Sequence, residues 1–349
     1  MHHRQVYKAL ITAILSSALL FTGCTKSEEV PNQINSSLEK IKISYQPGLY
    51  TALPIWVAEQ RGLWAEAGLD AEYSTYTAGV PQMAASASKS WDVGSAGLLP
   101  AIIGNSRFGV KTIGISNDES ATTSIYATEK VFQQFSADKN AIKSETIYVT
   151  QNSNADFVLK ECLKSFGINK NSLKIVNLGA SEIISAMAAN KASVAAVWAP
   201  YGYILENKAA SKELCNGSSI DTPVLTALVA RSEFAKEYPE RVEKFIQVYL
   251  ETWNWLLNNR TEAKQYMKEF YALGGVVLSD AEMEREFNLR KILPVAEQIQ
   301  WMNKNQGTSK FEQIIDKNSE FLFEAGVITK ITPPDQILDS SFMNSLNKD

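Results

Sequence analysis

The chain has 349 residues, of which 45% are hydrophobic and 21% charged, and its formal net charge is −4. That length is too great for one small core and predicts two domains of ordinary size. A mildly acidic chain without a long block of like charge does not indicate nucleic-acid binding. The only histidines are His2 and His3, at the extreme N-terminus.

Residues 1–23 have the pattern of an export signal. Arg4 and Lys8 precede an apolar run over residues 9–21, which is shorter than the roughly 20 apolar residues of a membrane-spanning helix. The run closes in Phe21-Thr22-Gly23-Cys24, which resembles the lipobox of bacterial lipoproteins, with Phe21 where leucine is usual. We therefore predict a lipoprotein signal peptide, lipidation of Cys24, and an extracytoplasmic protein anchored in a membrane on the periplasmic side or the cell surface. Ordinary secretion with cleavage elsewhere is the alternative.

Removal of this signal takes away both histidines and leaves 326 residues with 32 basic and 38 acidic side chains. A chain without histidine has no Ser-His-Asp or Cys-His nucleophile pair, no imidazole general base and no histidine-containing zinc site. We therefore expect a protein that is not an enzyme, with no catalytic residues, no metal site and no cofactor.

Two cysteines remain beyond Cys24, namely Cys162 and Cys215. Their spacing fits neither a zinc knuckle nor a Cys-x-x-Cys redox pair. They are either two small buried side chains or a disulfide, which an exported location permits. The sequence leaves both possibilities open.

The rest of the chain alternates between short β-rich and helical runs, after a polar tether over residues 24–40. This alternation is typical of parallel βαβ units. A first series has predicted strands at 41–45, 70–76, 92–95 and 110–116, with helices at 52–60, 81–89 and 99–105. A second series has strands at 123–128, 146–150, 173–178 and 193–198, with helices at 155–166 and 181–190.

A last strand, 224–231, precedes a helical tail. Residues 239–259 carry apolar side chains at helical spacing, and further helices follow to Gly326. The pattern predicts an α/β fold with two parallel-rich sheets, flanking helices and a helical C-terminal tail. The tail needs an apolar surface to cover, so we assign residues 41–125 plus 225–349 to lobe I and 126–224 to lobe II.

Turns after the predicted strands are the candidate ligand site, because ligands of open parallel sheets bind at the carboxyl ends of strands. Four such turns, at residues 45–50, 77–81, 95–97 and 151–154, lie at or near helix starts. Helix N-termini present unpaired N–H groups to a small anion without any lysine or arginine. Alternatively, Ser153 or Asn154 only caps its helix. Trp198 ends a strand just before Pro200 and is a candidate wall of the site. Neither Gly-rich phosphate loop occurs, so nucleotide binding is not expected.

Several motifs in register resemble the sulfonate, taurine, nitrate and thiamine-precursor binding proteins of ABC importers. The opening signature is Pro54-Ile55-Trp56-Val57-Ala58-Glu59, Arg61-Gly62-Leu63-Trp64 and Ala67-Gly68-Leu69-Asp70. Later matches are Trp91-Asp92-Val93-Gly94, Ser165-Phe166-Gly167-Ile168, Val197-Trp198-Ala199-Pro200-Tyr201 and the segment 234–240. The resemblance covers nearly everything from Ile41 to Phe342.

The resemblance implies a two-lobed periplasmic-binding-protein fold of type II that closes on a small solute. Family contacts carried onto matching positions are Gln46, Tyr50, Gly79, Ser95, Ala96, Gly97, Ser153, Asn154 and Trp198. The turn at 151–154 departs from the family's usual Gly-Ser or Ser-Thr type. Thr226 stands where taurine binders place an acidic residue for the amine, which disfavours taurine itself.

We therefore interpret the chain as the monomeric, lipid-anchored solute receptor of an ABC importer, with a permease and its ATPase as partners. Alkanesulfonate-like anions are the first ligand class, and a neutral aromatic or pyrimidine solute is the alternative. A sensor domain without transport is a second alternative. An enzyme of the pyrimidine-synthesis branch of this superfamily would need a histidine.

Overall fold

The computed structural model describes residues 38–304 and 307–346. The predicted signal peptide, Cys24 and the tether up to residue 37 lie outside these residues. Glu39 and Lys40, which the sequence placed in the tether, begin the first strand, where they pair with Leu69 and Asp70. Within the described residues, no helix combines the length and apolar character that crossing a membrane requires.

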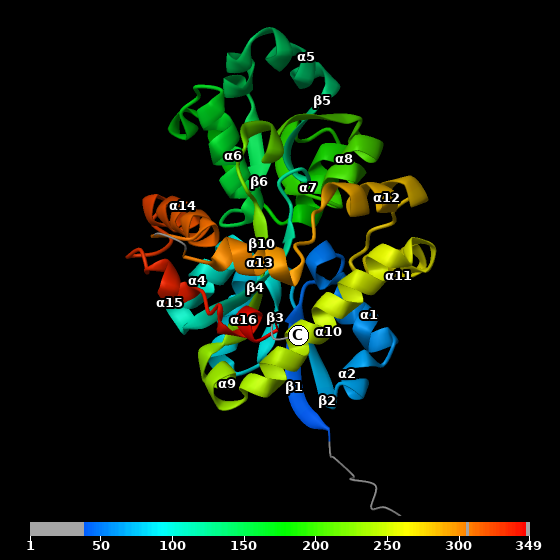
Figure 1. The fold of residues 1–349 in the computed structure, drawn as a ribbon. Coiled ribbons are helices and arrows are strands. Elements are labelled where there is room, and N and C mark those ends of the chain that lie inside the picture. The colour runs from blue at the N-terminus through cyan, green and yellow to red at the C-terminus, as the bar shows by residue number, and fades with distance from the viewer. Residues whose placement is uncertain (1–37, 305–306, 347–349) are drawn as a thin grey trace, which may run out of the picture. The chain divides into compact units, whose positions relative to one another are not determined.

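The first sheet has the strand order β2-β1-β3-β10-β4 (Figure 1). The strands are β1 (Glu39–Tyr45), β2 (Leu69–Thr75), β3 (Val93–Gly97), β4 (Val110–Asp118) and β10 (Leu225–Arg231). β1 is parallel to β2 and β3, whereas β10 runs antiparallel between β3 and β4. We call this sheet with its covering helices the first lobe.

The second sheet has the order β7-β6-β8-β5-β9 and forms the second lobe. Its strands are β5 (Thr123–Thr128), β6 (Thr146–Val149), β7 (Lys174–Asn177), β8 (Val194–Trp198) and β9 (Ser211–Asn216). Here β5 is the reversed strand, antiparallel to β8 and β9. The sequence did not predict β9, because Ser-Lys-Glu-Leu-Cys-Asn lacks the β-branched and aromatic residues that favour strands. Both sheets are therefore mixed, with one reversed strand where the chain crosses between them.

Helices cover both sheets and make up the tail. In the first lobe they are α1 (Leu53–Gln60), α2 (Leu63–Glu66), α3 (Gly79–Ala85) and α4 (Leu98–Phe108). In the second lobe they are α5 (Glu129–Ala137), α6 (Asn154–Ser165), α7 (Ala180–Ala188) and α8 (Tyr201–Ala209). The tail contains α9 (Ser232–Glu237), α10 (Pro239–Asn258), α11 (Arg260–Leu273), α12 (Asp280–Leu289), α13 (Val295–Met302), α14 (Lys310–Glu324), α15 (Pro334–Ile337) and α16 (Ser341–Ser345). The predicted α/β fold with a helical tail is confirmed.

The tail helix α10 packs its apolar face on the first lobe, as its helical spacing predicted. Phe245 stacks on Trp64 with ring centroids 5.7 Å apart, and Trp253 lies 4.5 Å from the ring of Tyr50. These side chains join the same hydrophobic core as the first sheet. Burial of such large rings removes apolar surface from water and holds the tail in place.

The tail also contacts the second lobe on two sides. Arg285 of α12 forms an ion pair with Glu206 of α8 at 2.6 Å. Lys317 of α14 pairs with Glu161 of α6 at 2.8 Å. The two sheets are therefore connected by tail contacts as well as by the crossings from β4 to β5 and from β9 to β10.

Cys162 and Cys215 form a disulfide, which resolves the alternatives that the sequence left open. The bond joins α6 to the edge strand β9, with the two Cα atoms 6.2 Å apart. Both residues lie in the core of the second lobe. The disulfide thus fixes the unpredicted strand β9 to α6.

Candidate functional site

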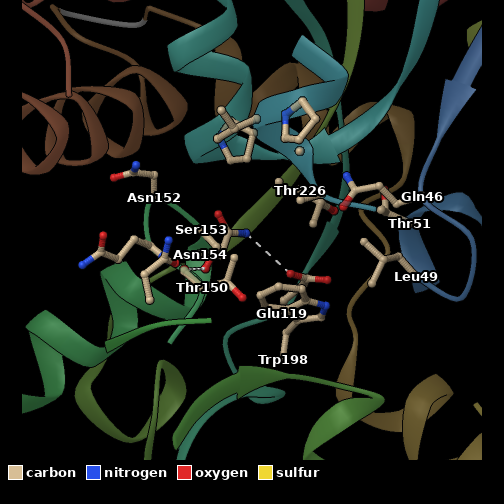
Figure 2. Close-up of a pocket in the computed structure, with 18 residues that line it drawn as sticks. Gln46, Leu49, Thr51, Glu119, Thr150, Asn152, Ser153, Asn154, Trp198 and Thr226 are labelled. Atoms are coloured by element: carbon tan, nitrogen blue, oxygen red, sulfur yellow. Dashed lines mark hydrogen bonds between the residues drawn. The ribbon is translucent and has the colours of Figure 1, made fainter. Parts of the chain in front are cut away.

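A cavity of about 290 Å³ lies between the two sheets and is lined by residues of both (Figure 2). Six of the nine residues that the resemblance implied line it: Gln46, Gly79, Gly97, Ser153, Asn154 and Trp198. The structure therefore brings five separate chain segments together around one space. The other wall residues are Leu49, Thr51, Ala78, Val80, Pro81, Pro100, Glu119, Thr150, Gln151, Asn152, Asn177 and Thr226.

Gln46 and Gly79 bound the cavity on the side of the first lobe. The amide nitrogen of Gln46 donates to Gln82 Oε1 at 2.9 Å, and the Gln82 amide donates in turn to Ser44 Oγ at 2.9 Å. This chain of buried amides fixes the orientation of Gln46. A Cβ at Gly79 would lie 2.5 Å from the Pro100 ring, so α3 and α4 approach closely only because residue 79 is glycine.

The second lobe contributes the start of α6. Ser153 is the N-cap, and its hydroxyl accepts from the backbone N–H of Asp156 at 3.4 Å, so it caps its helix as well as lining the cavity. The next residue, Asn154, reaches across to the first lobe. Its amide donates to the Leu225 carbonyl at 3.1 Å, and its Oδ1 accepts from the N–H of Leu99 in α4 at 3.5 Å.

Three residues that the resemblance implied do not line the cavity. Ser95 and Ala96 are fully buried in β3, because the strand continues to Gly97 and only that last residue reaches the cavity. Tyr50 turns inward, where its ring packs against Trp253, and its phenol pKa is raised by burial. These three side chains support the wall and are not part of its surface.

Glu119 is the wall residue that sequence reasoning missed. It directly follows β4 at the crossing to the second sheet and is 6% exposed. The rule that favoured the turns after the first three strands would have reached it if applied to the fourth. It lines the same cavity as Trp198, Gln46 and Thr226, all of which Figure 2 labels.

Glu119 belongs to a buried charge cluster. Its Oε1 accepts from Arg290 Nη1 at 3.2 Å, and Arg290 also pairs with Glu286 at 3.5 Å. Arg290 is almost fully buried, and it donates to the carbonyl oxygen of Ala199 at the end of the second lobe's β8. Burial raises the pKa of Glu119, while Arg290 counteracts part of that effect. One guanidinium therefore serves two carboxylates beside the cavity.

Trp198 provides the apolar surface of the site. Its indole lies edge-on to Tyr201, with centroids 5.9 Å apart. It also borders a second hollow of about 280 Å³, together with Gln46 and Leu49. The indole thus borders both hollows, and its contact with a ligand stays a prediction.

The wall of the cavity is polar but almost uncharged. Within residues 38–304 and 307–346, no lysine or arginine lines it, and no cluster of three His, Cys, Asp or Glu side chains could hold a metal. Its polar groups are amides, hydroxyls, the starts of α4 and α6 and one carboxylate. Helix N-termini from two lobes are suited to an anionic group of a solute.

Comparisons with known proteins identify a matching family and several similar proteins. The family model described as NMT1/THI5 like matches residues 51–263. A Bacillus subtilis (strain 168) protein named for the binding of aliphatic sulfonates is 24% identical over 341 residues, 96% of each chain. A Brucella abortus (strain 2308) protein named only for binding is 26% identical over 221 residues, which is 61% of this chain and 66% of that relative. That alignment spans just under two thirds of the relative's length.

Solved structures share the fold at low sequence identity. The aliphatic sulphonate binding protein SsuA from Escherichia coli has a TM-score of 0.70 at 14% identity, covering 87% of this chain and 93% of its own. The alkanesulfonate-binding protein SsuA from Xanthomonas axonopodis pv. citri, bound to MOPS, has 0.68 at 16%, covering 86% and 98%. The nitrate-binding protein NrtA from Synechocystis PCC 6803 has 0.67 at 13%, covering 88% of both.

Proposed function

The chain belongs to the NMT1/THI5-like family, and from that premise we propose that it is the extracytoplasmic solute receptor of an ABC importer. It captures a small anionic, alkanesulfonate-like solute and delivers it to a membrane permease and its ATPase. One observation carries this proposal: the cavity is shared by two lobes, and the starts of α4 and α6 meet at it. Their N–H groups and dipoles favour an anion without a lysine or arginine.

The mechanism we propose is closure of the lobes over the solute, with no covalent chemistry. The sequence predicted residues 41–125 plus 225–349 and residues 126–224 as the two bodies. Its boundary at residue 125 falls inside β5 (Thr123–Thr128), and because all of β5 belongs to the second sheet, residues 123–125 move with the second lobe. Asn154 supports this mechanism, because its amide already bonds to groups of the first lobe from its place on α6. A solute that contacts both walls would stabilise the closed arrangement by its differential affinity for it.

A neutral aromatic or pyrimidine solute is the second candidate. Trp198 favours it, because an indole edge or face in a mostly polar cavity is a stacking surface. A ligand-sensing domain without transport is a third candidate, and it differs from a receptor in its partner. Co-purification of a permease and ATPase with the tagged chain from membranes would support transport, whereas recovery of a membrane sensor alone would contradict it.

A thermal-shift screen with alkanesulfonates, nitrate and pyrimidines tests the ligand class. A solute at about 100 times its Kd stabilises the folded protein by roughly 2.7 kcal/mol, which is an easily measured rise in Tm. We expect alkanesulfonates to give the largest rise. If none of them stabilises the protein and an unrelated solute does, the proposed ligand class is wrong.

Trp198 gives an independent readout. Binding should change tryptophan fluorescence, and Trp198→Phe should remove most of that change. Trp301→Phe is the matched control, because Trp301 lies on α13 and does not line the cavity. If the fluorescence change on binding is the same in the Trp198→Phe variant as in the parent, the solute does not bind beside Trp198.

Membrane anchoring through Cys24 is part of the proposal. The support is the Phe21-Thr22-Gly23-Cys24 motif after a short apolar run. The substitution Cys24→Ser should move the protein from the membrane to the soluble extracytoplasmic fraction. Fractionation of cells that express this variant measures the change. Equal membrane association of both forms would contradict lipidation. We also propose that the receptor is a monomer, which light scattering of the purified protein measures directly.

A further inference from the structure

The cavity contains one ionisable side chain among its described wall residues, and that side chain is acidic. The backbone of Glu119 is held at both crossings between the sheets. Its N–H donates to the carbonyl oxygen of Val224 at 2.7 Å, and its own carbonyl accepts from Thr122 at 2.9 Å. The backbone that carries the carboxylate is therefore fixed at the wall, and the carboxylate itself is held by Arg290.

The charge balance around Glu119 is incomplete. Glu119 and Glu286 share Arg290, and Asp118 adds a further carboxylate next to Glu119 in the chain. The neighbouring phenols do not change this balance. Burial raises the pKa of Tyr271, so its phenol stays neutral. Buried ionised groups need a partner of opposite charge. The cluster with both glutamates ionised has one negative charge more than Arg290 can balance.

One oxygen of Glu119 retains acceptor capacity. Oε1 accepts from Arg290 at 3.2 Å, whereas Oε2 is approached by the amide of Asn154 at only 3.5 Å. A carboxylate oxygen has two lone pairs, and 3.5 Å is at the long limit for a hydrogen bond. Oε2 thus accepts only this one long hydrogen bond and retains a lone pair for a donor in the cavity, which Glu119 lines together with Trp198 (Figure 2).

We propose that Glu119 determines the specificity of the cavity, and that the solute carries a protonated amine or another N–H donor at the end that meets this carboxylate. The inference rests on the proposed function, in which the starts of α4 and α6 bind the anionic group at the opposite end of the solute. It narrows the ligand to amino-substituted sulfonates and solutes of like charge pattern. A simple oxyanion would add negative charge beside a cluster that already has an excess.

This inference revises the expectation drawn from Thr226. The absence of an acidic residue on that strand disfavoured taurine itself. Thr226 and Glu119 both line the cavity, so the carboxylate comes from the end of β4 and not from β10. An amine-bearing sulfonate therefore fits this cavity with a different counter-ion.

A matched pair of ligands tests the proposal. 3-Aminopropanesulfonate and butane-1-sulfonate have the same length and differ by an ammonium in place of a methyl group. Titration calorimetry on the purified extracytoplasmic chain should show roughly 10- to 100-fold tighter binding of the amine, the range expected for a hydrogen bond to a charged group. Glu119→Gln should reduce that preference to nearly none. Tighter binding of butane-1-sulfonate by the unmodified protein would overturn the proposal.

The variant is expected to fold, because Glu119→Gln leaves Arg290 and Glu286 as a neutral pair. Glu129→Gln, which removes a carboxylate from the half-exposed surface of α5, is the control and should keep the full preference. A preference that survives Glu119→Gln would also overturn the proposal. The ligand pair measured on the unmodified protein keeps the test valid even if the variant were unstable.

Failure of the proposed function has a different signature. If neither sulfonate binds, the anionic class is wrong, and the role of Glu119 is then measured with 4-aminopyrimidine and 4-methylpyrimidine. A preference for the amino compound that Glu119→Gln removes would support the inference with a neutral solute. Equal binding of the two pyrimidines, or no binding of either, would overturn it.

Discussion

The guanidinium of Arg290 and the carboxylate of Glu119 lie 3.2 Å apart, although 171 positions separate them in the chain. Glu119 stands where the chain leaves the first sheet, and Arg290 follows the tail helix α12. Arg290 also donates to Ala199 in the second lobe. One buried side chain thus connects a crossing strand, the tail and the second lobe behind the cavity.

Replacing Arg290 by methionine should strongly destabilise the protein. The variant would bury Glu119 and Glu286 without a cation, and breaking a buried ion pair in this way costs about 3–5 kcal/mol. Urea unfolding monitored by circular dichroism measures the loss. Adding Glu119→Gln and Glu286→Gln should restore much of it, because no unpaired charge then remains. A loss below about 1 kcal/mol would show that Arg290 is not the stabilising partner described here.

Glu119 should make the folded state less stable as the pH rises. Burial raises the pKa of its carboxyl above the ordinary value of 4.5, so the folded protein holds this proton more tightly than the unfolded chain. Its contribution to the free energy of unfolding therefore falls between pH 4.5 and the raised pKa. Glu119→Gln should remove this downward contribution. The difference in free energy of unfolding, variant minus parent, should therefore be lower at low pH than at neutral pH.

Glu312 provides a contrast of opposite sign. The carboxylate is partly desolvated, but Lys304 at 2.7 Å and the capping of Ser309 lower its pKa. Its stabilising contribution is present above its unfolded pKa of 4.5 and is lost as the pH falls through the lowered value. Unfolding curves between pH 3 and pH 7 for Glu312→Gln and Glu119→Gln should therefore differ from the parent in opposite directions. Slopes of the same sign would contradict the assignment.

Removing the disulfide should destabilise the second lobe. Cys162 and Cys215 are 53 positions apart, and loss of a native bridge of such loop length costs about 2–5 kcal/mol. The double variant Cys162→Ala/Cys215→Ala should show this loss in urea, and a reductant should lower the parent's stability to a similar level. The reductant should leave the double variant unchanged. Equal stability of the parent and the double variant would contradict a structural role.

Gly97→Ala tests whether the lobes must approach at the cavity. The backbone at Gly97 has φ −61° and ψ 150°, which alanine adopts without strain. A Cβ there would lie 3.2 Å from Oδ1 of Asn154 in the other lobe. We expect affinity for the solute to fall roughly tenfold, about 1.4 kcal/mol, with little change in the unfolding free energy of the free protein. Calorimetry and urea unfolding separate the two effects, and unchanged affinity would argue against closure at this point.

Local patterns account for what could be predicted. Strand and helix periodicity identified the two α/β series and the amphipathic face of α10, because those signals repeat within a few residues. The rule that strand ends form ligand sites located the turns, and the family resemblance named Gln46, Gly79, Gly97, Ser153, Asn154 and Trp198, all of which line the cavity. The resemblance also named Tyr50, whose side chain faces the core, since a residue's position in a turn does not reveal which way its side chain faces.

The sequence by itself determined the fold class, the export pattern at residues 1–24 and the segments from which the cavity is built. Only the tertiary structure decided which distant residues meet: Cys162 with Cys215, Asn154 with Leu225, and Glu119 with Arg290. The physical reason is the distance along the chain over which each signal acts. Periodicity and turn chemistry act over a few residues, whereas these pairs depend on how the two crossings and the tail pack against one another. The charge of the cavity is therefore a property of the fold.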